Sequence, residues 1–390
     1  MVPIRGSENI SRRIWRSFSR RLAFLAAALL ISACADGAGK DWTGRYQDPD
    51  YLSGLPWPTE EWTVSTPEGH GMDSAVLTGA RDYAAEPGRH TQGVVVVRHN
   101  VIVAEWYFGG ADADTPATSW SMAKSFASAL VGIAIGAGKI AGVDRPLTDY
   151  YPEWAGTDKA EITLRHVLSM TSGLDWKEGY EGDAGDSDVM RMLLIETDQL
   201  AYAAGLGLAH APGSYWSYSS GDSMLLSGVL EAASGTTASV FAEEVLFSPI
   251  GMRNVVWDSD QAGHTLTYCC LNTPSRQFAK FGVLFLRGGK WGGRQVVPNE
   301  WVRESTRPSQ ELYTGYGYQW WLYDPGDPTW ADTTGFPKDI FLAWGHHSQK
   351  IIIVPSLDLV VVRNGVPWQV PDEWNDGDFL KPVLDSIKGE

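Results

Sequence analysis

The chain has 390 residues, of which 44% are hydrophobic, which is ample for the core of one large or two modest domains. Its formal net charge is −16, and residues 1–33 carry six arginines against one glutamate, so the remainder is more acidic still. This charge argues against nucleic acid or an anionic membrane surface as the main partner.

The N-terminus has the pattern of an export signal. Pairs of arginines precede ten apolar residues at 22–31, a run too short to span a bilayer stably. The run ends in Ile31-Ser-Ala-Cys34, which resembles the bacterial lipobox, whose cysteine is lipidated and becomes the mature N-terminus. Residues 19–25 also loosely resemble a twin-arginine signal. The sequence therefore predicts a signal peptide at 1–33 and a periplasm-facing lipoprotein of the cell envelope, held to the membrane through Cys34. The alternative is a plain signal peptide with an incidental cysteine.

Residues 34–68 are rich in Gly, Asp, Pro and Thr, and we interpret them as a tether that becomes a strap on a domain at 69–390. The remaining cysteines, Cys269 and Cys270, are adjacent. We interpret them as two buried thiols, with a vicinal disulfide as the alternative in an oxidising compartment. The spacing of Cys and His predicts neither a disulfide framework nor a zinc site.

The two ends of the domain each predict a β-hairpin, because β-branched and aromatic runs lie close together there. Helical spacing dominates the region between them. The sequence predicts an α/β (α+β) fold in which one antiparallel sheet, built from both chain ends, is flanked by helices and interrupted by a mainly helical inserted region. A site would lie in the groove between these parts. The expected strands are 93–98, 102–107, 350–355 and 359–363, and the expected helical stretches are 187–204, 223–233, 238–247 and 378–388.

Ser121 and Lys124 stand three residues apart at the start of a long run of small and apolar residues. If that run is a helix, the hydroxyl and the amine share one face about one turn apart. A buried lysine that loses its proton can then take one from the serine and make it a nucleophile. The alternative is that Ser121 caps the helix and Lys124 is a solvated residue of its first turn. Burial is favoured by the neighbours Met122, Ala123 and Phe126, and by the cost of a cation at a helix N-terminus.

Two further segments carry polar groups suited to acyl transfer. Tyr218 and Ser220 lie in a short polar loop just before a predicted helix, where a phenol near a lysine can relay protons to a leaving group. Gly345 and His346 follow Ala343 and Trp344 directly before the predicted strand at 350–355. A glycine at a strand edge lets the backbone approach a substrate, and a free N–H there can bind an oxyanion.

Together these three segments resemble the serine β-lactamase-like superfamily, which includes class C β-lactamases, DD-peptidases, esterases and 6-aminohexanoate-dimer hydrolase. The order and spacing of the segments match, and residues 162–174, 246–252 and 273–282 are also similar to family stretches. The resemblance covers roughly residues 70–385 and implies the β-lactamase/transpeptidase-like fold for the serine hydrolase domain.

The resemblance implies Ser121 as the nucleophile, Lys124 as its general base and Tyr218 as the proton relay. The oxyanion hole would be formed by the backbone N–H groups of Ser121 and His346. The expected reaction is acylation of Ser121 followed by attack of water on the acyl-enzyme, with no cofactor and no metal. Gly345 and Ser220 would contact the substrate.

Two departures from the family pattern narrow the expected substrate. Penicillin-recognising members carry Lys-Ser/Thr-Gly in the third segment, whereas this chain has Ala343-Trp344-Gly345. The second segment often has Tyr-x-Asn, and here it ends at Ser220. Loss of the lysine removes a charge-assisted contact worth roughly 1.5–3 kcal/mol. The pattern therefore favours an amidase or esterase similar to 6-aminohexanoate-dimer hydrolase and the carboxylesterases. A penicillin-binding DD-peptidase or β-lactamase is the alternative among enzymes, and a catalytically idle envelope lipoprotein is the alternative of another class.

Tryptophans cluster in sequence around the three segments. We expect Trp120, Trp216 and Trp344 to line an aromatic cleft for a small-molecule amide or ester, and Trp320 and Trp321 to belong to the core. Acidic residues at 179–188 form the expected lip that would attract an amine-bearing substrate.

Other patterns predict no further chemistry. His346-His347 would suggest a metal, but neighbouring strand residues point to opposite faces, and a third ligand at suitable spacing is missing. His166 is expected to cap or pack within its helix, and Gly221-Asp-Ser-Met-Leu, which looks like a lipase block, falls in mid-chain.

Overall fold

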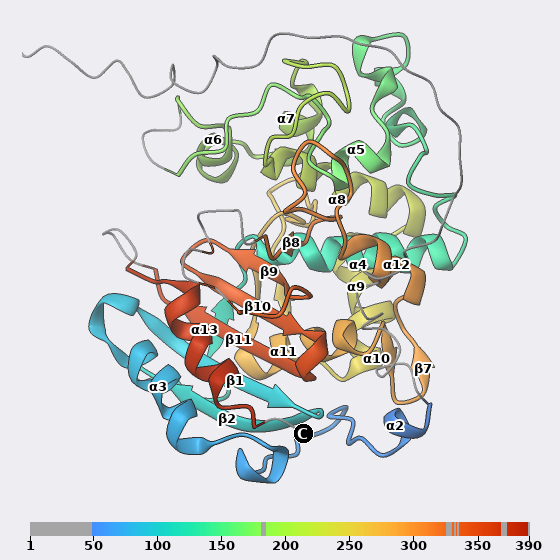
Figure 1. The fold of residues 1–390 in the computed structure, drawn as a ribbon. Coiled ribbons are helices and arrows are strands. Elements are labelled where there is room, and N and C mark those ends of the chain that lie inside the picture. Colours follow the sequence, from blue (N-terminus) through green and yellow to red (C-terminus); the bar gives the residue numbers. More distant parts are fainter. Residues whose placement is uncertain are drawn as a thin grey trace, which may run out of the picture. The chain divides into compact units, whose positions relative to one another are not determined.

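The computed structural model describes residues 49–180, 185–324, 330, 333, 335–367 and 373–388. Its centre is a six-stranded sheet of order β2-β1-β11-β10-β9-β8. Each pair of neighbouring strands is antiparallel, and Figure 1 shows the strands from the two ends of the chain side by side. The predicted sheet from both chain ends is confirmed. The strands are β1 (Thr91–Arg98), β2 (Val101–Tyr107), β8 (Trp321–Leu322), β9 (Phe341–Gly345), β10 (Gln349–Val354) and β11 (Leu359–Gly365).

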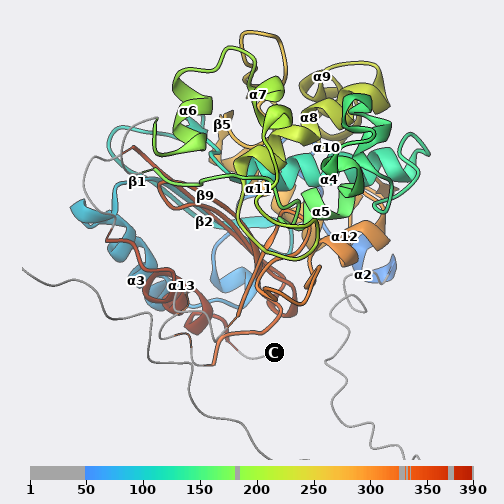
Figure 2. The ribbon, with the colours of Figure 1, turned by 90° about the horizontal axis from the view of Figure 1, so that it is seen from above.

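Both faces of the sheet are covered, so its central strands are apolar along their length. Val95 and Val97 of β1 face the main core, whereas Val94 and Val96 face a second cluster. The second cluster is closed by α3 (Ser74–Ala85) and α13 (Asp376–Asp385), while α11 (Ser275–Leu286) packs on the other face, as Figure 2 shows from above. The closing helix predicted at 378–388 is confirmed with a start two residues earlier.

The inserted region between the hairpins is mainly helical, as predicted. The stretch expected at 187–204 is two helices, because the chain turns after Ile195 and Asp198 caps a new helix start through the N–H of Ala201. A single turn of π-helix at Glu243–Phe247 continues α9. Helices here are α5 (Leu164–Leu168), α6 (Asp188–Leu194), α7 (Gln199–Gly205), α8 (Ser220–Ser234), α9 (Ala238–Ala242) and α10 (Ser248–Ile250).

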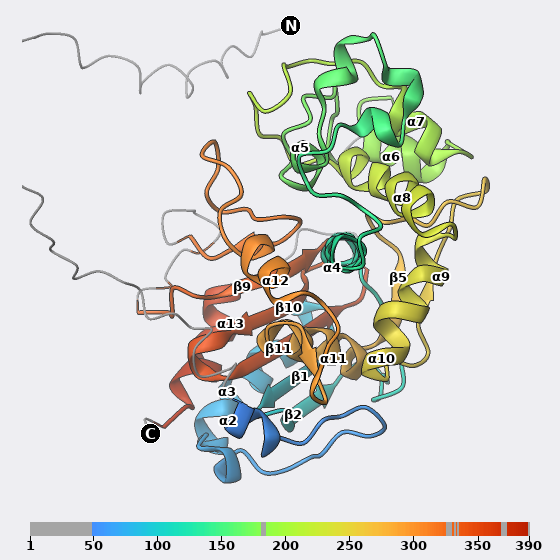
Figure 3. The same cartoon turned by 90° about the vertical axis from the view of Figure 1, so that its right-hand side faces the viewer.

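Helix α4 (Met122–Gly136) lies between the sheet and the helical region, and Figure 3 views it end-on in that place. Residues 122–134 of α4 are all buried, because β9, α8, α9 and α12 (Asn299–Ser305) surround it. Gly132 is needed for this packing, since a Cβ there would lie 2.2 Å from the ring of Trp301 on α12. A helix apolar all round is expected for such a central position.

Smaller elements complete the domain. Two short sheets lie outside the main sheet. Residues 55–64 lie against the domain, where Val64 forms a β-bridge with Ile102 of β2 and Trp62 Nε1 donates to the carbonyl of Arg276 on α11. In the part of the chain that the structure describes, no single helix is long and apolar enough to cross a membrane; the bent pair Ser220–Ser234 and Ala238–Ile250 passes by length and composition only. The remaining elements are α2 (Pro49–Ser53), β3 (Pro116–Thr118), β4 (Val256–Trp257), β5 (Leu271–Pro274), β6 (Lys290–Trp291) and β7 (Arg294–Gln295).

Cys269 and Cys270 form a vicinal disulfide, so their interpretation as two thiols is wrong. The disulfide lies in a turn in which Cys270 has a φ of 66°, in the left-handed region. The turn lies against the start of α4, since the N–H of Leu271 donates to the hydroxyl of Ser119 at 3.0 Å. The predicted signal peptide, Cys34 and the first part of the tether lie outside the described residues.

Candidate active site

The first turn of α4 brings Ser121 and Lys124 together. Lys124 Nζ lies 2.9 Å from Ser121 Oγ, 3.0 Å from Ser220 Oγ and 3.1 Å from the carbonyl oxygen of Tyr268. Ser121 stands at the N-cap position, but its side chain caps no helix N–H. Lys124 is only 1% exposed. The alternative of a capping serine and a solvated lysine is therefore wrong.

The environment of Lys124 favours a neutral amine. Burial lowers the pKa of Lys124 to about 8, and the negative charge of Glu178 acts in the opposite direction. A lysine with such a pKa is partly deprotonated near neutral pH and can act as a base. This is the property that the chemistry predicted for Lys124 requires.

Tyr218 lies beside the same pair. Lys124 Nζ is 5.0 Å from the centroid of the Tyr218 ring. Burial raises the pKa of Tyr218 well above its ordinary value, as do Tyr316 and Glu178, while a hydrogen bond with Ser121 lowers it. Tyr218 therefore keeps its proton when Lys124 has lost its own. The site therefore holds a protonated phenol beside an amine that can lose its proton, which is the pair that acid–base chemistry requires.

Gly345 places the end of β9 directly against Ser121. A Cβ on Gly345 would lie 3.1 Å from the backbone nitrogen of Ser121 and 2.3 Å from the carbonyl oxygen of Ser119. Trp120, just before the nucleophile, has a φ of 47°, a conformation that costs a bulky residue energy and is typical of functional turns. The end of β9 therefore lies against the backbone of Ser119 and Ser121, where the oxyanion hole is predicted.

His346 and His347 lie in the turn that joins β9 to β10, not on a strand. Their ring centroids are 4.0 Å apart and both contact Trp120, so the expectation that they point to opposite faces is wrong. His346 also stacks on Tyr180 at 4.5 Å. Among the described residues no group of three or more His, Cys, Asp or Glu has the geometry to hold a metal ion. His166 is confirmed as part of a capping box at the start of α5.

Glu178 is the site residue that the sequence did not predict. Its Oε1 accepts from Ser220 Oγ at 2.7 Å and from the Tyr180 hydroxyl at 3.0 Å. Its Oε2 accepts from the Ser220 N–H at 2.9 Å and from Trp176 Nε1 at 2.6 Å. Ser220 is fully buried and joins Glu178 to Lys124, so it is not the substrate contact that was expected. A lone glutamate in a loop carries no motif that could have identified it.

The aromatic residues are distributed differently from the prediction. Trp320 is fully buried, as expected, but Trp321 stacks on Tyr218 at 5.3 Å and belongs to the site. Trp344 lies on the opposite face of β9 from Gly345, and Lys350 Nζ sits 3.4 Å from its ring centroid. Trp216 contacts Trp321 at 6.4 Å, in a group with Tyr313 and Tyr316. Trp120 and Trp216 thus flank the site, and Trp344 reaches it only through Trp321.

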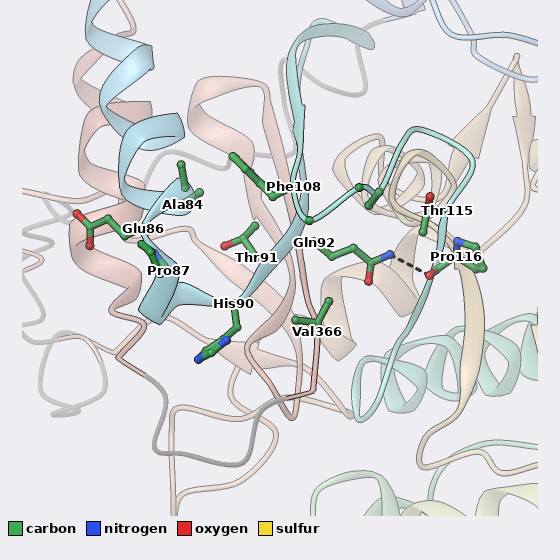
Figure 4. A pocket seen from close by; sticks show the side chains of 14 residues that line it. Ala84, Glu86, Pro87, His90, Thr91, Gln92, Phe108, Thr115, Pro116 and Val366 are labelled. Carbon is green, nitrogen blue, oxygen red and sulfur yellow. Dashed lines mark hydrogen bonds between the residues drawn. The ribbon is translucent and has the colours of Figure 1, made fainter.

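Two cavities in the described part of the chain are lined by residues other than Ser121. One of about 560 Å³ lies at the end of β1 and is lined by Phe108, His90 and Gln92, whose amide donates to the carbonyl of Pro116 (Figure 4). The second, of about 210 Å³, lies behind the Tyr218 loop and is lined by Ser219 and Ser172 among others. None of the predicted catalytic residues lines either cavity. Of the acidic lip, Asp186 is exposed, while residues 181–184 lie outside the described part.

Comparison with known proteins assigns a family to a chain with this sheet and inserted helical region. The model of the beta-lactamase family matches residues 80–372. The chain belongs to the beta-lactamase family. The superfamily resemblance and the fold class predicted from the sequence are therefore confirmed.

Known proteins of this family include hydrolases. The chain is 24% identical over 303 residues to a 6-aminohexanoate-dimer hydrolase of Paenarthrobacter ureafaciens, covering 72% of this chain and 74% of that one. A family VIII carboxylesterase has a TM-score of 0.61 at 16% identity, over 81% of this chain and 99% of its own. A penicillin binding protein from Bacillus halodurans has a TM-score of 0.60 at 14% identity, over 80% and 99%. These likenesses support a hydrolase of the beta-lactamase fold.

Proposed function

We propose that the protein is an exported serine hydrolase that cleaves an amide or ester through an acyl-enzyme on Ser121. The observation that carries the proposal is the 2.9 Å contact between Ser121 Oγ and a buried Lys124 whose pKa is lowered to about 8. A buried amine with a hydroxyl at hydrogen-bond distance is the arrangement that activates a serine without a histidine.

In the proposed reaction, the Ser121 O–H proton passes to the lone pair of Lys124 and the serine oxygen bonds to the substrate carbonyl carbon. The oxyanion accepts hydrogen bonds from the N–H groups of Ser121 and His346. When the intermediate collapses, the bond to the leaving nitrogen or oxygen breaks. The leaving atom takes a proton from Tyr218, and Lys124 returns a proton to Tyr218. Water then releases the acyl group by the same steps in reverse.

The contacts of the third segment favour simple amides and esters over penicillins. β9 carries Ala343-Trp344-Gly345 where penicillin-recognising members place a lysine. The nearby Lys350 does not replace it, because its amine forms an ion pair with Asp376 at 2.8 Å and is 1% exposed. An acyl donor that lacks a carboxylate therefore loses no binding contact through the absence of this lysine. Its apolar chain can lie along Trp120 and Trp321. An amine at the far end of the substrate would be drawn to the acidic segment at 179–188.

The export part of the proposal rests on residues 1–34 alone. We propose that the protein is a lipoprotein of the bacterial cell envelope facing the periplasm, with its lipid at Cys34. Labelling with palmitate that is lost in Cys34→Ala, together with precursor accumulation under globomycin, tests this. An unlabelled wild-type protein contradicts it and leaves the hydrolase proposal untouched.

Mass spectrometry with two reagents tests the hydrolase proposal. A fluorophosphonate is expected to form an adduct on Ser121 of the wild-type protein and none on Ser121→Ala. Turnover of nitrophenyl esters and linear amides, with Ser121→Ala as the blank, then gives the substrate class. A lasting penicilloyl adduct would instead support a penicillin-binding DD-peptidase. No adduct with either reagent and no turnover would leave a catalytically idle envelope protein.

A further inference from the structure

The hydrogen bonds around Lys124 have a fixed direction, which follows from counting donors and acceptors. A carboxylate only accepts hydrogen bonds, through about four lone-pair positions. Glu178 receives four donors, which are the N–H and hydroxyl of Ser220, Trp176 Nε1 and the Tyr180 hydroxyl. The Ser220 hydroxyl proton is therefore committed to Glu178.

This commitment determines what Ser220 offers to Lys124. With its proton on Glu178, Ser220 Oγ can only accept from Lys124, from which it lies 3.0 Å away. The carbonyl of Tyr268, at 3.1 Å, also accepts. A neutral amine has two N–H groups and one lone pair. Because both N–H groups are used by Ser220 and Tyr268, the lone pair is left for the third neighbour, the hydroxyl of Ser121.

We propose that Glu178 is a positioning residue of this site, which holds the Ser220 hydroxyl as an acceptor and so directs the lone pair of Lys124 at Ser121. The inference rests on the proposed function and deepens it. Burial of the groups supports it, since Ser220 and Lys124 are 0% and 1% exposed and water has little access to exchange these bonds. The charges and dipoles around Lys124 come from Glu178, Ser220, Tyr268 and Tyr218, and the ionisable Asp222 lies on α8, the helix that begins with Ser220.

Replacement of Glu178 by glutamine is expected to reverse the direction of the hydrogen bonds that link Lys124, Ser220 and residue 178. The N–H of Ser220 and the indole of Trp176 cannot become acceptors, so the amide oxygen must face them. The amide NH₂ then points at the Ser220 hydroxyl, which turns its proton toward Lys124 and occupies the lone pair. We expect Glu178→Gln to lower kcat by roughly ten- to a hundred-fold, the size of a lost charge-assisted hydrogen bond. Glu178→Asp, which still only accepts, should keep more activity than Glu178→Gln.

A double mutant separates this role from a merely structural one. In Glu178→Gln/Ser220→Ala the misdirected hydroxyl is absent, so kcat is expected to rise above that of Glu178→Gln alone. If Glu178 only supports the loop, the second substitution will lower kcat further. Loss of the negative charge also moves the alkaline rise of kcat/KM to lower pH, because Glu178 favours the charged form of Lys124. Glu231→Gln, on the same helix as Ser220 and bonded to His264, is the control and should keep wild-type rates.

Lysine-selective NMR of the full chain provides a readout that needs no turnover. Titration of ¹³C,¹⁵N-lysine protein should show a lower pKa for Lys124 in Glu178→Gln than in the wild type. If fluorophosphonate and esters fail on the wild type while this shift is present, the proposed function is wrong and only the electrostatic link between Glu178 and Lys124 stands. An unchanged Lys124 titration, or wild-type kcat in Glu178→Gln, overturns the inference.

Discussion

At the scale of single residues, the site depends on two pKa values that burial moves in opposite directions. Burial favours the neutral form of both groups, so it lowers the pKa of Lys124 and raises that of Tyr218. In free solution the two side chains titrate within about one pH unit of each other. Inside the protein they separate, and this separation lets the amine act as base while the phenol remains an acid.

The first prediction concerns pH. Because the base form of Lys124 is required, kcat/KM should rise with pH through a value near 8, where the amine loses its proton. Lys124→Met should lower kcat by roughly 10²–10⁴-fold, since general-base catalysis contributes that much. Asp222, whose pKa burial raises to about 7, is the other group titrating nearby. If the rise of kcat/KM with pH disappears in Asp222→Asn but persists in Lys124→Met, the titrating group is Asp222 and the prediction is wrong.

A second prediction concerns the adjacent residues Trp320 and Trp321, whose replacement should affect different properties of the protein. Trp320 is 0% exposed and stacks on Phe281, so Trp320→Ala should cost roughly 3–5 kcal/mol of unfolding free energy. Trp321 is partly buried and stacks on Tyr218, so Trp321→Ala should mainly lower kcat/KM. Chemical denaturation and ester kinetics on both variants test this difference. Equal losses of stability with no kinetic difference would contradict the placement of Trp321 in the site.

Sequence reasoning predicted Ser121, Lys124 and Tyr218 as site residues because each lies in a segment with a recognisable pattern, and the structure brings these side chains together. It missed Glu178, since a carboxylate that is joined to the lysine through a buried serine leaves no fixed spacing in the chain. It expected Trp344 in the cleft and Trp321 in the core, whereas Trp321 is the ring that stacks on Tyr218. Both rings pack on the same face of the sheet, so the alternation along a strand could not have separated them. The contact of Lys124 with a backbone carbonyl, that of Tyr268, has no sequence signal at all.

At the scale of elements, the approach of β9 to α4 is the contact on which the oxyanion hole depends. Gly345→Ala is expected to push the strand away, because its Cβ would lie 2.3 Å from the carbonyl oxygen of Ser119. The loss of one oxyanion donor costs roughly 10²–10³-fold in kcat. Gly207→Ala is a matched control, since a Cβ there meets nothing within 4 Å and the substitution should change neither rate nor stability. If Gly345→Ala retains wild-type kcat, His346 is not an oxyanion donor.

Helices and strands with a strong sequence pattern were predictable, whereas those that form only through contacts with other elements were not. The hairpins of β1 with β2 and β10 with β11 follow from long β-branched runs, because such runs fit a sheet buried on both faces. The two-residue edge strand β8 has no run of its own and exists through its pairing with β9. The break between α6 and α7 is made by the capping Asp198 inside an otherwise helical stretch.

At the scale of the whole molecule, α4 packs against both the sheet and the helical region, so we expect the two parts to unfold as one cooperative unit. It packs on β9 from one side and on α8 from the other, and it carries Ser121 and Lys124 at its start. The residues of the candidate site therefore come from both parts: Gly345 from the sheet, Tyr218 from the loop before α8 and Ser121 from the start of α4. A change in the packing of α4 should therefore destabilise the sheet and the helical region together.

Gly132→Ala tests this coupling, because the new Cβ would lie 2.2 Å from the ring of Trp301 and must displace α4 or α12. Overpacking of this kind costs roughly 1–3 kcal/mol. Hydrogen exchange measured by mass spectrometry should become faster in peptides from both α8 and β10, by similar factors, if the two parts open together. Gly205→Ala, at the end of α7 with nothing within 4 Å of its Cβ, is the control and should leave exchange unchanged. Faster exchange in only one of the two parts would show that α4 does not couple them.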